Sequence, residues 1–230
     1  MGTVMRPVKP QSRPGADRHA RARATRLRIT KAATTLFCER GYTGTTMNGV
    51  ADLAGVAVQT VYFVFHTKTD LLNSAYSLAV LGEDEPAPPQ AQGWYRQAVA
   101  EPDLVTAVRL VLKGVGEILR RVAPLDMAVR TAAVEDPDAA RFLAQNERLR
   151  ADGYREMVEF LRQKRPLRVD VSEERATDIM LFLASPGAYR ALVAERGWSH
   201  AEWVAWSSGA LAEQVFGVQR QGAIEPPGSG

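Results

Sequence analysis

The sequence predicts an all-α protein in which a three-helix head with a helix-turn-helix precedes a larger helical body. Apolar residues recur every three or four positions through most of residues 18–216, which is the spacing of helices with one buried face. No stretch alternates apolar and polar residues as a half-buried strand does, and no internal repeat is present. Glycines, prolines and capping residues divide the pattern into segments of helix length.

The composition is that of an ordinary soluble globular protein of 230 residues, with 46% hydrophobic and 24% charged residues. No apolar run reaches the roughly 18 residues needed to cross a bilayer, and the first residues lack the apolar core of a secretory signal. The single cysteine, Cys38, excludes an internal disulfide and a cysteine-cluster zinc site. His19, His66 and His200 are too scattered to suggest a local metal motif. We therefore expect a reduced, cytoplasmic protein that uses no metal and no cofactor.

Positive charge is concentrated at the N-terminal end. Residues 1–72 hold 11 Lys and Arg against 4 Asp and Glu, whereas residues 73–230 hold 18 against 22. Residues 1–17, rich in proline, are predicted to form a flexible basic arm. A basic head on a mildly acidic body is typical of a protein that binds a polyanion, although a solvated basic tail gives the same balance.

Residues 18–72 are predicted to form the head. The first helix ends at Gly41 and carries one apolar stripe. Two short helices follow: one over 47–54, capped by the threonine pair before it, and one over 57–65 after a glycine. Because two short helices cannot bury their own apolar faces, the stripe must supply a third wall. Its residues are Ile29, Ala32, Ala33, Leu36 and Phe37.

The body is predicted to cover residues 73–216. The helix over 68–81, with Asp70 as a capping-box acid, joins it to the head, and a proline-rich loop over 82–93 follows. The remaining helices are predicted over 103–122, from Pro124 onward, over 136–164, 172–184, 188–195 and 199–216, before a frayed tail at 217–230.

The helices at 172–184 and 199–216 are apolar on more than one side. A single stripe suits a helix that lies on its own core, whereas a wider apolar surface indicates a second partner. We expect these two helices to form a homodimer interface. Burial in the centre of the monomer is the alternative.

Residues 28–72 resemble the start of a TetR-family transcriptional regulator. The resemblance rests on three ordered runs: Arg28-Ile29-x-x-Ala32-Ala33-x-x-Leu36-Phe37-x-Glu39-x-Gly41-Tyr42-x-x-Thr45-Thr46, Val50-Ala51-x-x-Ala54-Gly55-Val56, and Thr60-Val61-Tyr62-Phe63-x-Phe65-x-x-Lys68-x-x-Leu71-Leu72. Together they cover about a quarter of the chain. The resemblance implies a helix-turn-helix whose recognition helix is the segment 57–64.

A helix that enters the major groove needs short polar or small residues at its exposed N-terminal end, so that base edges come within reach. Gln59 suits adenine, and Thr60 suits a base edge or a thymine methyl group. Val61 and Phe65 are assigned to the core. For Tyr62, both core packing and contact with phosphate stay open. The other candidates are expected to contact phosphate or thymine methyl groups. The full set of DNA-contact candidates is Thr45, Thr46, Ala57, Val58, Gln59, Thr60, Tyr62, Phe63, His66 and Lys68.

Three residues depart from the family pattern. Ala57 stands where a capping serine is common, Gln59 stands where a small residue is usual, and Val64 stands where a ring is usual. These departures leave the docking of the head unchanged and bear on which bases it reads. Gln59 is the residue from which we expect a distinctive base preference.

The resemblance also implies that the body encloses a pocket for a small effector. Candidate pocket residues lie on the middle helices, with an aromatic pair as a lid, although core packing is the alternative for each. They are Trp94, Tyr95, Met127, Arg130, Phe142, Asn146, Tyr154 and Met157. The body holds both Arg130 and several acids, so the charge of the effector stays open.

The sequence therefore predicts a DNA-binding transcriptional regulator. The resemblance implies a repressor, which is the usual role in this family. It is expected to bind a near-palindromic operator as a homodimer and to be released by a small molecule. An enzyme is not expected, since hydrolase, metalloprotease, P-loop and dinucleotide-binding motifs are absent from the sequence. A helical interaction module whose basic head binds nucleic acid nonspecifically is the remaining alternative.

Overall fold

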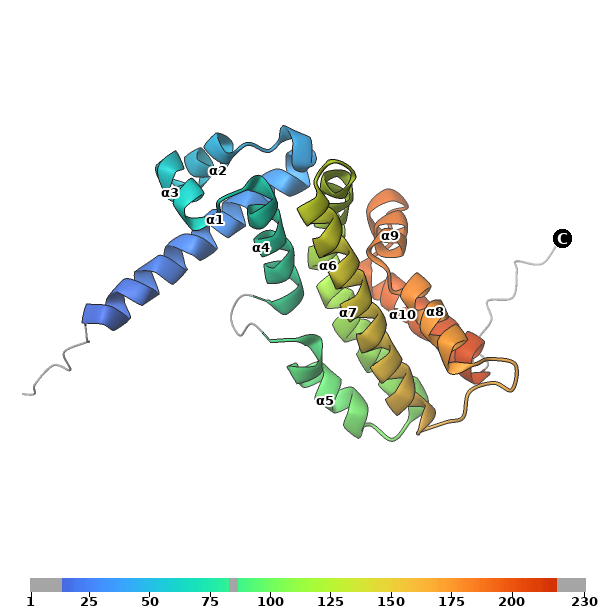
Figure 1. Cartoon of the computed structure of the whole chain (residues 1–230). Coiled ribbons are helices and arrows are strands. Elements are labelled where there is room, and N and C mark those ends of the chain that lie inside the picture. Colours follow the sequence, from blue (N-terminus) through green and yellow to red (C-terminus); the bar gives the residue numbers. More distant parts are fainter. Residues whose placement is uncertain (1–13, 83–86, 219–230) are drawn as a thin grey trace, which may run out of the picture.

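The computed structural model describes residues 14–82 and 87–218, and within these ranges the regular structure is helical throughout (Figure 1). This confirms the all-α prediction. The elements are α1 (Pro14–Gly44), α2 (Met47–Ala54), α3 (Val58–Val64), α4 (Lys68–Leu81), a 3-10 turn η1 (Pro89–Ala91), α5 (Gly93–Ala100), α6 (Leu104–Glu135), α7 (Pro137–Arg162), α8 (Glu173–Leu183), α9 (Pro186–Tyr189), a π-helical turn η2 (Arg190–Glu195) and α10 (His200–Phe216).

Figure 1 shows α2 and α3 lying against α1 at one end of the molecule, with α4 leading from them toward the long helices α6 and α7. Ile29 and Phe37 of α1, Val61 of α3 and Leu71 of α4 are almost fully buried in this head. The apolar stripe on α1 is therefore the wall that closes the two short helices, as predicted.

The capping residues behave as the sequence predicts. Thr46 accepts a hydrogen bond from the Gly49 amide at 3.1 Å, and Thr67 and Asp70 form a reciprocal capping box at the start of α4. Gly41 and Gly55 have φ angles of 66° and 62°, in the left-handed region that favours glycine, and they interrupt α1 and end α2.

No single helix among the described residues is both long enough and apolar enough to cross a membrane. The pair α2 and α3 reaches that length and composition only together, and it is bent by 108° at its break. In the head, α2 buries Met47, Val50, Ala51 and Ala54, and α3 buries Val61.

Helix α6 corrects the prediction that a new helix begins at Pro124. It runs unbroken from Leu104 to Glu135, with Pro124 inside it. Proline removes one backbone hydrogen bond from a helix and costs about 3 kcal/mol. Pro124 lies on the exposed side, where water can reach the freed carbonyl, while buried neighbours on both sides hold the helix together.

The segment after the proline-rich loop also differs from the prediction. Residues 93–100 form helix α5, where the sequence signalled only a lid. Its Trp94 lies directly on the backbone of α6, since a Cβ atom at Gly114 would come within 2.0 Å of the indole ring. The absence of a side chain at Gly114 therefore lets α5 dock. At the other end of the chain, α1 already begins at Pro14, inside the predicted arm, and residues 1–13 lie outside the described ranges.

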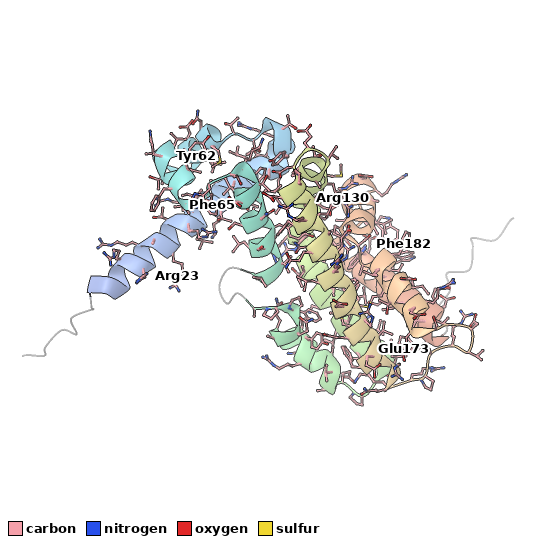
Figure 2. The ribbon with its side chains drawn as sticks, in the orientation of Figure 1. Arg23, Tyr62, Phe65, Arg130, Glu173 and Phe182 are labelled. Atoms are coloured by element: carbon pink, nitrogen blue, oxygen red, sulfur yellow. The ribbon has the colours of Figure 1, made fainter. Side chains whose placement is uncertain are left out.

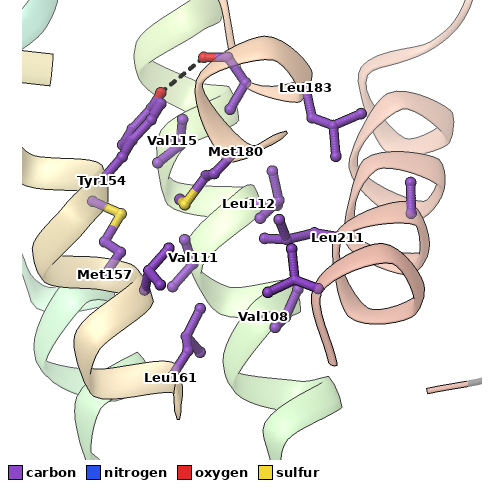
Figure 3. Close-up of a cluster of buried hydrophobic side chains, with 14 of the residues drawn as sticks. Val108, Val111, Leu112, Val115, Tyr154, Met157, Leu161, Met180, Leu183 and Leu211 are labelled. Atoms are coloured by element: carbon purple, nitrogen blue, oxygen red, sulfur yellow. Dashed lines mark hydrogen bonds between the residues drawn. The ribbon is translucent and has the colours of Figure 1, made fainter. Parts of the chain in front are cut away.

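The buried apolar side chains form two clusters, and α6 contributes to both. In its N-terminal half, Val108, Leu112 and Val115 face α7, α8 and α10 in the body cluster (Figure 3). In its C-terminal half, Leu125 and Val129 belong to the same cluster as the head. The cluster that holds the head core thus continues past residue 72 into α4, α6 and α7.

Because α6 continues through Pro124, this proline lowers the stability of the fold, and its replacement should restore that stability. We expect Pro124→Ala to increase the free energy of unfolding by up to about 3 kcal/mol, because it restores the missing hydrogen bond in the helix interior. Pro137→Ala is the matched control, since Pro137 occupies the first turn of α7, where proline is tolerated. Urea unfolding of both variants measures the difference. A loss of stability in Pro124→Ala would show that the proline is needed to turn the chain.

Candidate nucleic-acid interface and cavity

Helix α3 presents its polar and aromatic residues outward. Gln59 is exposed, Tyr62 is 51% exposed and Phe63 is 83% exposed, whereas Val61 is fully buried. Figure 2 places Tyr62 at the outer edge of the head. Tyr62 is thus a surface residue and not a core residue. Ala57 precedes the helix without a side-chain cap, which is the expected consequence of alanine at that position.

The C-terminal end of α3 is fixed to α1 by Arg26. Its Nη1 donates to the carbonyl oxygen of Val64 at 3.2 Å, and its guanidinium carbon lies 4.3 Å from the centre of the Phe65 ring. Phe65 is itself buried. A cation at a helix C-terminus donates a hydrogen bond to a free carbonyl group and interacts favourably with the negative end of the helix dipole. Helical spacing alone does not predict this role for Arg26, because its hydrogen bond joins residues 38 positions apart.

The DNA-contact candidates outside α3 differ in burial and in their hydrogen bonds. Thr45 is buried and its hydroxyl donates to the carbonyl oxygen of Gly41 at 2.8 Å, which makes it an internal residue of the head. Thr46 and His66 are exposed. Lys68 is partly buried: its Nζ donates to the carbonyl oxygen of Tyr42 at 3.0 Å and lies 4.1 Å from the Tyr42 ring centre. Desolvation lowers the pKa of Lys68, although the charge of Glu135 opposes this.

The exposed N-terminal part of α1 carries a row of basic residues. It extends away from the rest of the molecule on the side of the head, and Figure 2 shows Arg23 on this extension. Arg18, Arg21 and Arg23 are all exposed there. Arg13, which the sequence also assigned to the arm, lies outside the described residues. The head therefore combines an outward-facing short helix with a basic extension.

A chain of hydrogen bonds connects the head to the turn between α6 and α7. Thr69 at the start of α4 donates to Asp136 Oδ2 in a short hydrogen bond, and Tyr42 Oη lies 2.9 Å from Thr69 Oγ1. Since the Thr69 proton points to Asp136, Tyr42 donates to Thr69. The other oxygen of Asp136 accepts from the Asp138 amide at 2.8 Å and caps α7. One carboxylate thus links the head to the start of α7.

A cavity of about 330 Å³ lies between α4, α6 and α7, with η1 and the start of α9 at its edges. Its wall is mainly apolar, with a few polar groups, as in typical small-molecule sites. The lining residues are Tyr76, Ser77, Val80, Leu81, Pro88, Pro89, Gln90, Val115, Ile118, Leu119, Val122, Asn146, Glu147, Leu149, Arg150, Gly153, Tyr154, Met157 and Pro186.

Three of the eight candidate effector residues line this cavity: Asn146, Tyr154 and Met157. Met127 is 48% exposed on the outer side of α6, and Arg130 forms ion pairs with Asp126 and Glu147.

Of the four aromatic candidates, only Tyr154 lines the cavity, and the other three pack elsewhere. Phe142 packs edge-on against Tyr76, with ring centres 5.6 Å apart. Trp94 lies on Gly114, and the Tyr95 ring contacts the rings of Trp94 and Phe160. The predicted lid is therefore a packing contact between α5, α6 and α7.

Arg150, which was not among the predicted pocket residues, shares a helix face with two that were. Asn146, Arg150 and Tyr154 stand four residues apart on α7 and so share one face of it. Tyr154 donates to the carbonyl oxygen of Ala184 at 2.8 Å (Figure 3). Burial raises the pKa of the Tyr76 hydroxyl to about 12 and also raises that of Tyr154, which keeps both neutral. Within 14–82 and 87–218, no three His, Cys, Asp or Glu side chains are grouped as metal ligands would be.

Comparisons with known proteins bear on the head and on the fold. Residues 29–75 match the family described as bacterial regulatory proteins, tetR family. The fatty acid degradation regulator FadR from Bacillus halodurans has a similar structure, with 15% identity, a TM-score of 0.66 and coverage of 81% of this chain and 94% of that one. No curated protein matches the sequence significantly.

Two further structures share the architecture. NalD, the secondary repressor of the MexAB-OprM multidrug efflux pump in Pseudomonas aeruginosa, has 19% identity and a TM-score of 0.61, covering 85% of this chain and 98% of that one. A TetR transcription regulator from Haloarcula marismortui has 17% identity and a TM-score of 0.60, covering 84% and 96%. At these identities the likeness concerns the fold.

The contacts of Arg26 predict a role in holding α3. We expect Arg26→Met to lower the free energy of unfolding by about 1 kcal/mol, because it removes a cation–π contact and a hydrogen bond at the helix end. Arg28→Met is the control, since Arg28 is an equally exposed arginine of α1. Urea unfolding followed by circular dichroism compares the two. Equal stability of both variants would mean that Arg26 does not fix the helix.

Proposed function

Since the chain carries a tetR-family DNA-binding head on the fold of that family's transcriptional regulators, we propose that it is a sequence-specific repressor. It binds a near-palindromic operator as a homodimer, and a small molecule in the body cavity releases it. The observation that carries this proposal is the outward-facing α3 beside the basic extension of α1. A short helix that offers polar and small side chains to the major groove, flanked by arginines for phosphate, is the arrangement of a helix-turn-helix reader.

The proposed base reading comes from the N-terminal half of α3. Gln59 donates and accepts at an adenine edge, Thr60 contacts a base or a thymine methyl group, and Ala57 and Val58 offer apolar contact to thymine. Phosphate contacts come from Thr46, the Tyr62 hydroxyl, His66 and the remaining N–H groups of Lys68, and the Phe63 ring packs on the sugar–phosphate backbone. Thr45 is left out of this set, because its buried hydroxyl is already bonded inside the head.

The proposed dimer forms through α8 and α10. Phe182 on α8 is 73% exposed and Trp206 on α10 is 37% exposed, although both helices also bury residues in the body. Figure 2 shows Phe182 on the side of the body away from the head. Exposed aromatic side chains on adjacent helices are typical of protein interfaces. Two heads on a two-fold axis would double the base contacts, which a helix of seven residues needs for discrimination.

The proposed release works through α4. Tyr76, Ser77, Val80 and Leu81 of this helix line the cavity, while Leu71 and Leu72 lie in the head core. The protein is proposed to have two conformations, of which only one binds DNA. A molecule that binds the other conformation more tightly lowers the population of the DNA-binding one. Nonspecific nucleic-acid binding by the basic head is the second candidate, and the charge on α1 alone would support it.

Selection of duplexes from a random DNA pool at physiological salt tests the proposed function. The repressor proposal predicts an enriched motif with two-fold symmetry. Failure to enrich any motif, with binding that disappears as salt rises, would leave the nonspecific module.

Gln59→Ala is expected to change the base preference at one position of each half-site, because it removes a pair of hydrogen bonds to a base edge. The loss corresponds to about 1–3 kcal/mol of discrimination. Arg23→Ala is the matched control: it should weaken all duplexes alike and reduce the slope of affinity against salt by about one unit. Titration of sequence variants of the selected duplex measures both. Unchanged preference at every position in Gln59→Ala would remove Gln59 from the readout.

Phe182→Glu is expected to convert the dimer to a monomer, because it places a charge in an apolar interface. Val134→Glu is the control, since Val134 is 85% exposed on α6, outside α8 and α10. Sedimentation analysis at micromolar concentration reports the oligomeric state. A dimer that persists in Phe182→Glu would place the interface elsewhere.

A further inference from the structure

Arg150 is the one cavity residue that combines a positive charge with an unsatisfied buried atom. Its side chain lines the cavity between α4 and α7, and its Nε is buried without a hydrogen-bond partner. A buried N–H that no acceptor meets costs free energy, and more so when it belongs to a charged group. Such a group in a cavity wall indicates an acceptor supplied by a ligand.

The acids near Arg150 are engaged elsewhere. Glu147 also lines the cavity, but its carboxylate pairs with Arg130 at 3.1 Å and is 45% exposed. Arg130 in turn bonds Asp126 at 2.9 Å. Glu156 accepts a hydrogen bond from the Gln90 amide at 3.1 Å. Among the residues that the structure describes, the cavity wall therefore offers a guanidinium group and no carboxylate paired with it.

The hydroxyl groups around Arg150 are neutral. Its charge acts on both Tyr76 and Tyr154, yet burial outweighs this effect and raises the pKa of both. The Tyr154 proton is used on the carbonyl oxygen of Ala184. Neutral phenols leave the charge of the Arg150 guanidinium uncompensated.

The opposite wall is hydrocarbon. Val115, Ile118, Leu119 and Val122 of α6 face the cavity, and Met157 adds a flexible thioether from α7. About 330 Å³ is at the small end of ligand sites and suits a single chain or a compact ring system. One cationic wall and one apolar wall together fit a molecule with an anionic end and an apolar body.

We propose that the effector is an amphipathic carboxylic acid, whose carboxylate pairs with the Arg150 guanidinium and whose hydrocarbon part contacts the α6 wall. This assignment rests on the proposed function, in which the cavity is the effector site. A carboxylate in the cavity accepts from the guanidinium N–H groups in a charge-assisted contact, which offsets the cost of a cation in this wall. An alcohol of the same length would fill the apolar volume but leave the charge uncompensated.

Calorimetric titration of the full-length protein with decanoate, 1-decanol and decylammonium tests the assignment. We expect decanoate to bind roughly ten-fold to one-hundred-fold more tightly than 1-decanol, which is the range for a hydrogen bond to a charged group. Decylammonium should bind most weakly, since its charge repels Arg150.

Arg150→Met is expected to abolish the preference for decanoate over 1-decanol while keeping binding of the alcohol. Arg150→Lys keeps the charge without the planar fork and should retain part of the preference, which guards against misfolding in the first variant. Arg148→Met is the matched control, because Arg148 is an exposed arginine of the same helix that does not line the cavity. It should bind all three probes as the parent protein does.

Equal affinity for decanoate and 1-decanol, a preference that survives in Arg150→Met, or no binding of any probe would each overturn the proposal. Duplex selection with the same preparation separates this failure from that of the proposed function. If the protein selects a symmetric site but shows no carboxylate preference, only the effector assignment is wrong. If it selects no site, the repressor proposal fails while the calorimetric result on Arg150 stands.

Discussion

The burial of one continuous helix in two hydrophobic clusters is the constraint on which the rest of the structure depends. Helix α6 gives its N-terminal half to the body and its C-terminal half to the head. A helix is stiff along its axis, so the two halves keep a fixed relation as long as its hydrogen bonds hold. The head is therefore placed on the body by packing and not by a flexible linker.

Two further features depend on this placement. The hydrogen bonds from Tyr42 through Thr69 to Asp136 reach the end of α6 only because the head lies on its C-terminal half. The cavity exists because α4 leaves the head along α6 and α7 without filling the space between them. A molecule that enters the cavity meets α4 and α6 at once. Both helices continue into the head core, so the proposed effector would have a direct mechanical route to the head.

Local signals predicted the parts of the fold that are decided locally. Thr46, Thr67 and Gly55 cap or end helices by contacts within a few residues, and the sequence identified all three. Pro124 misled the prediction because its cost is local, whereas the burial that outweighs it comes from the head and from α7. Helix α5 was missed because its docking needs Gly114, which is 20 residues from Trp94 and on another helix.

The candidate site residues also divide into those that local spacing predicts and those that only the packing of helices brings together. The exposed residues of α3 follow from helical spacing, since Val61 faces inward and Gln59 and Phe63 face outward. The cavity depends on which faces of three helices meet, so only part of its lining could be named from the sequence. Arg130 was the cation that sequence reasoning chose, yet it is paired at the surface, and Arg150 lines the cavity. Helical spacing puts Arg150 on the same face of α7 as Asn146 and Tyr154, but only the packing of α4 and α6 shows that this face lines a cavity.

Head and body are expected to unfold together, and the chain supplies one probe for each. Cys38 is the only cysteine and is exposed on α1 in the head, while all four tryptophans lie in the body. Urea unfolding followed by a fluorophore on Cys38 and, separately, by tryptophan emission should give superimposable transitions, because both regions share α6. A Cys38 transition at lower urea than the tryptophan transition would show that the head is an independent unit and would contradict the account.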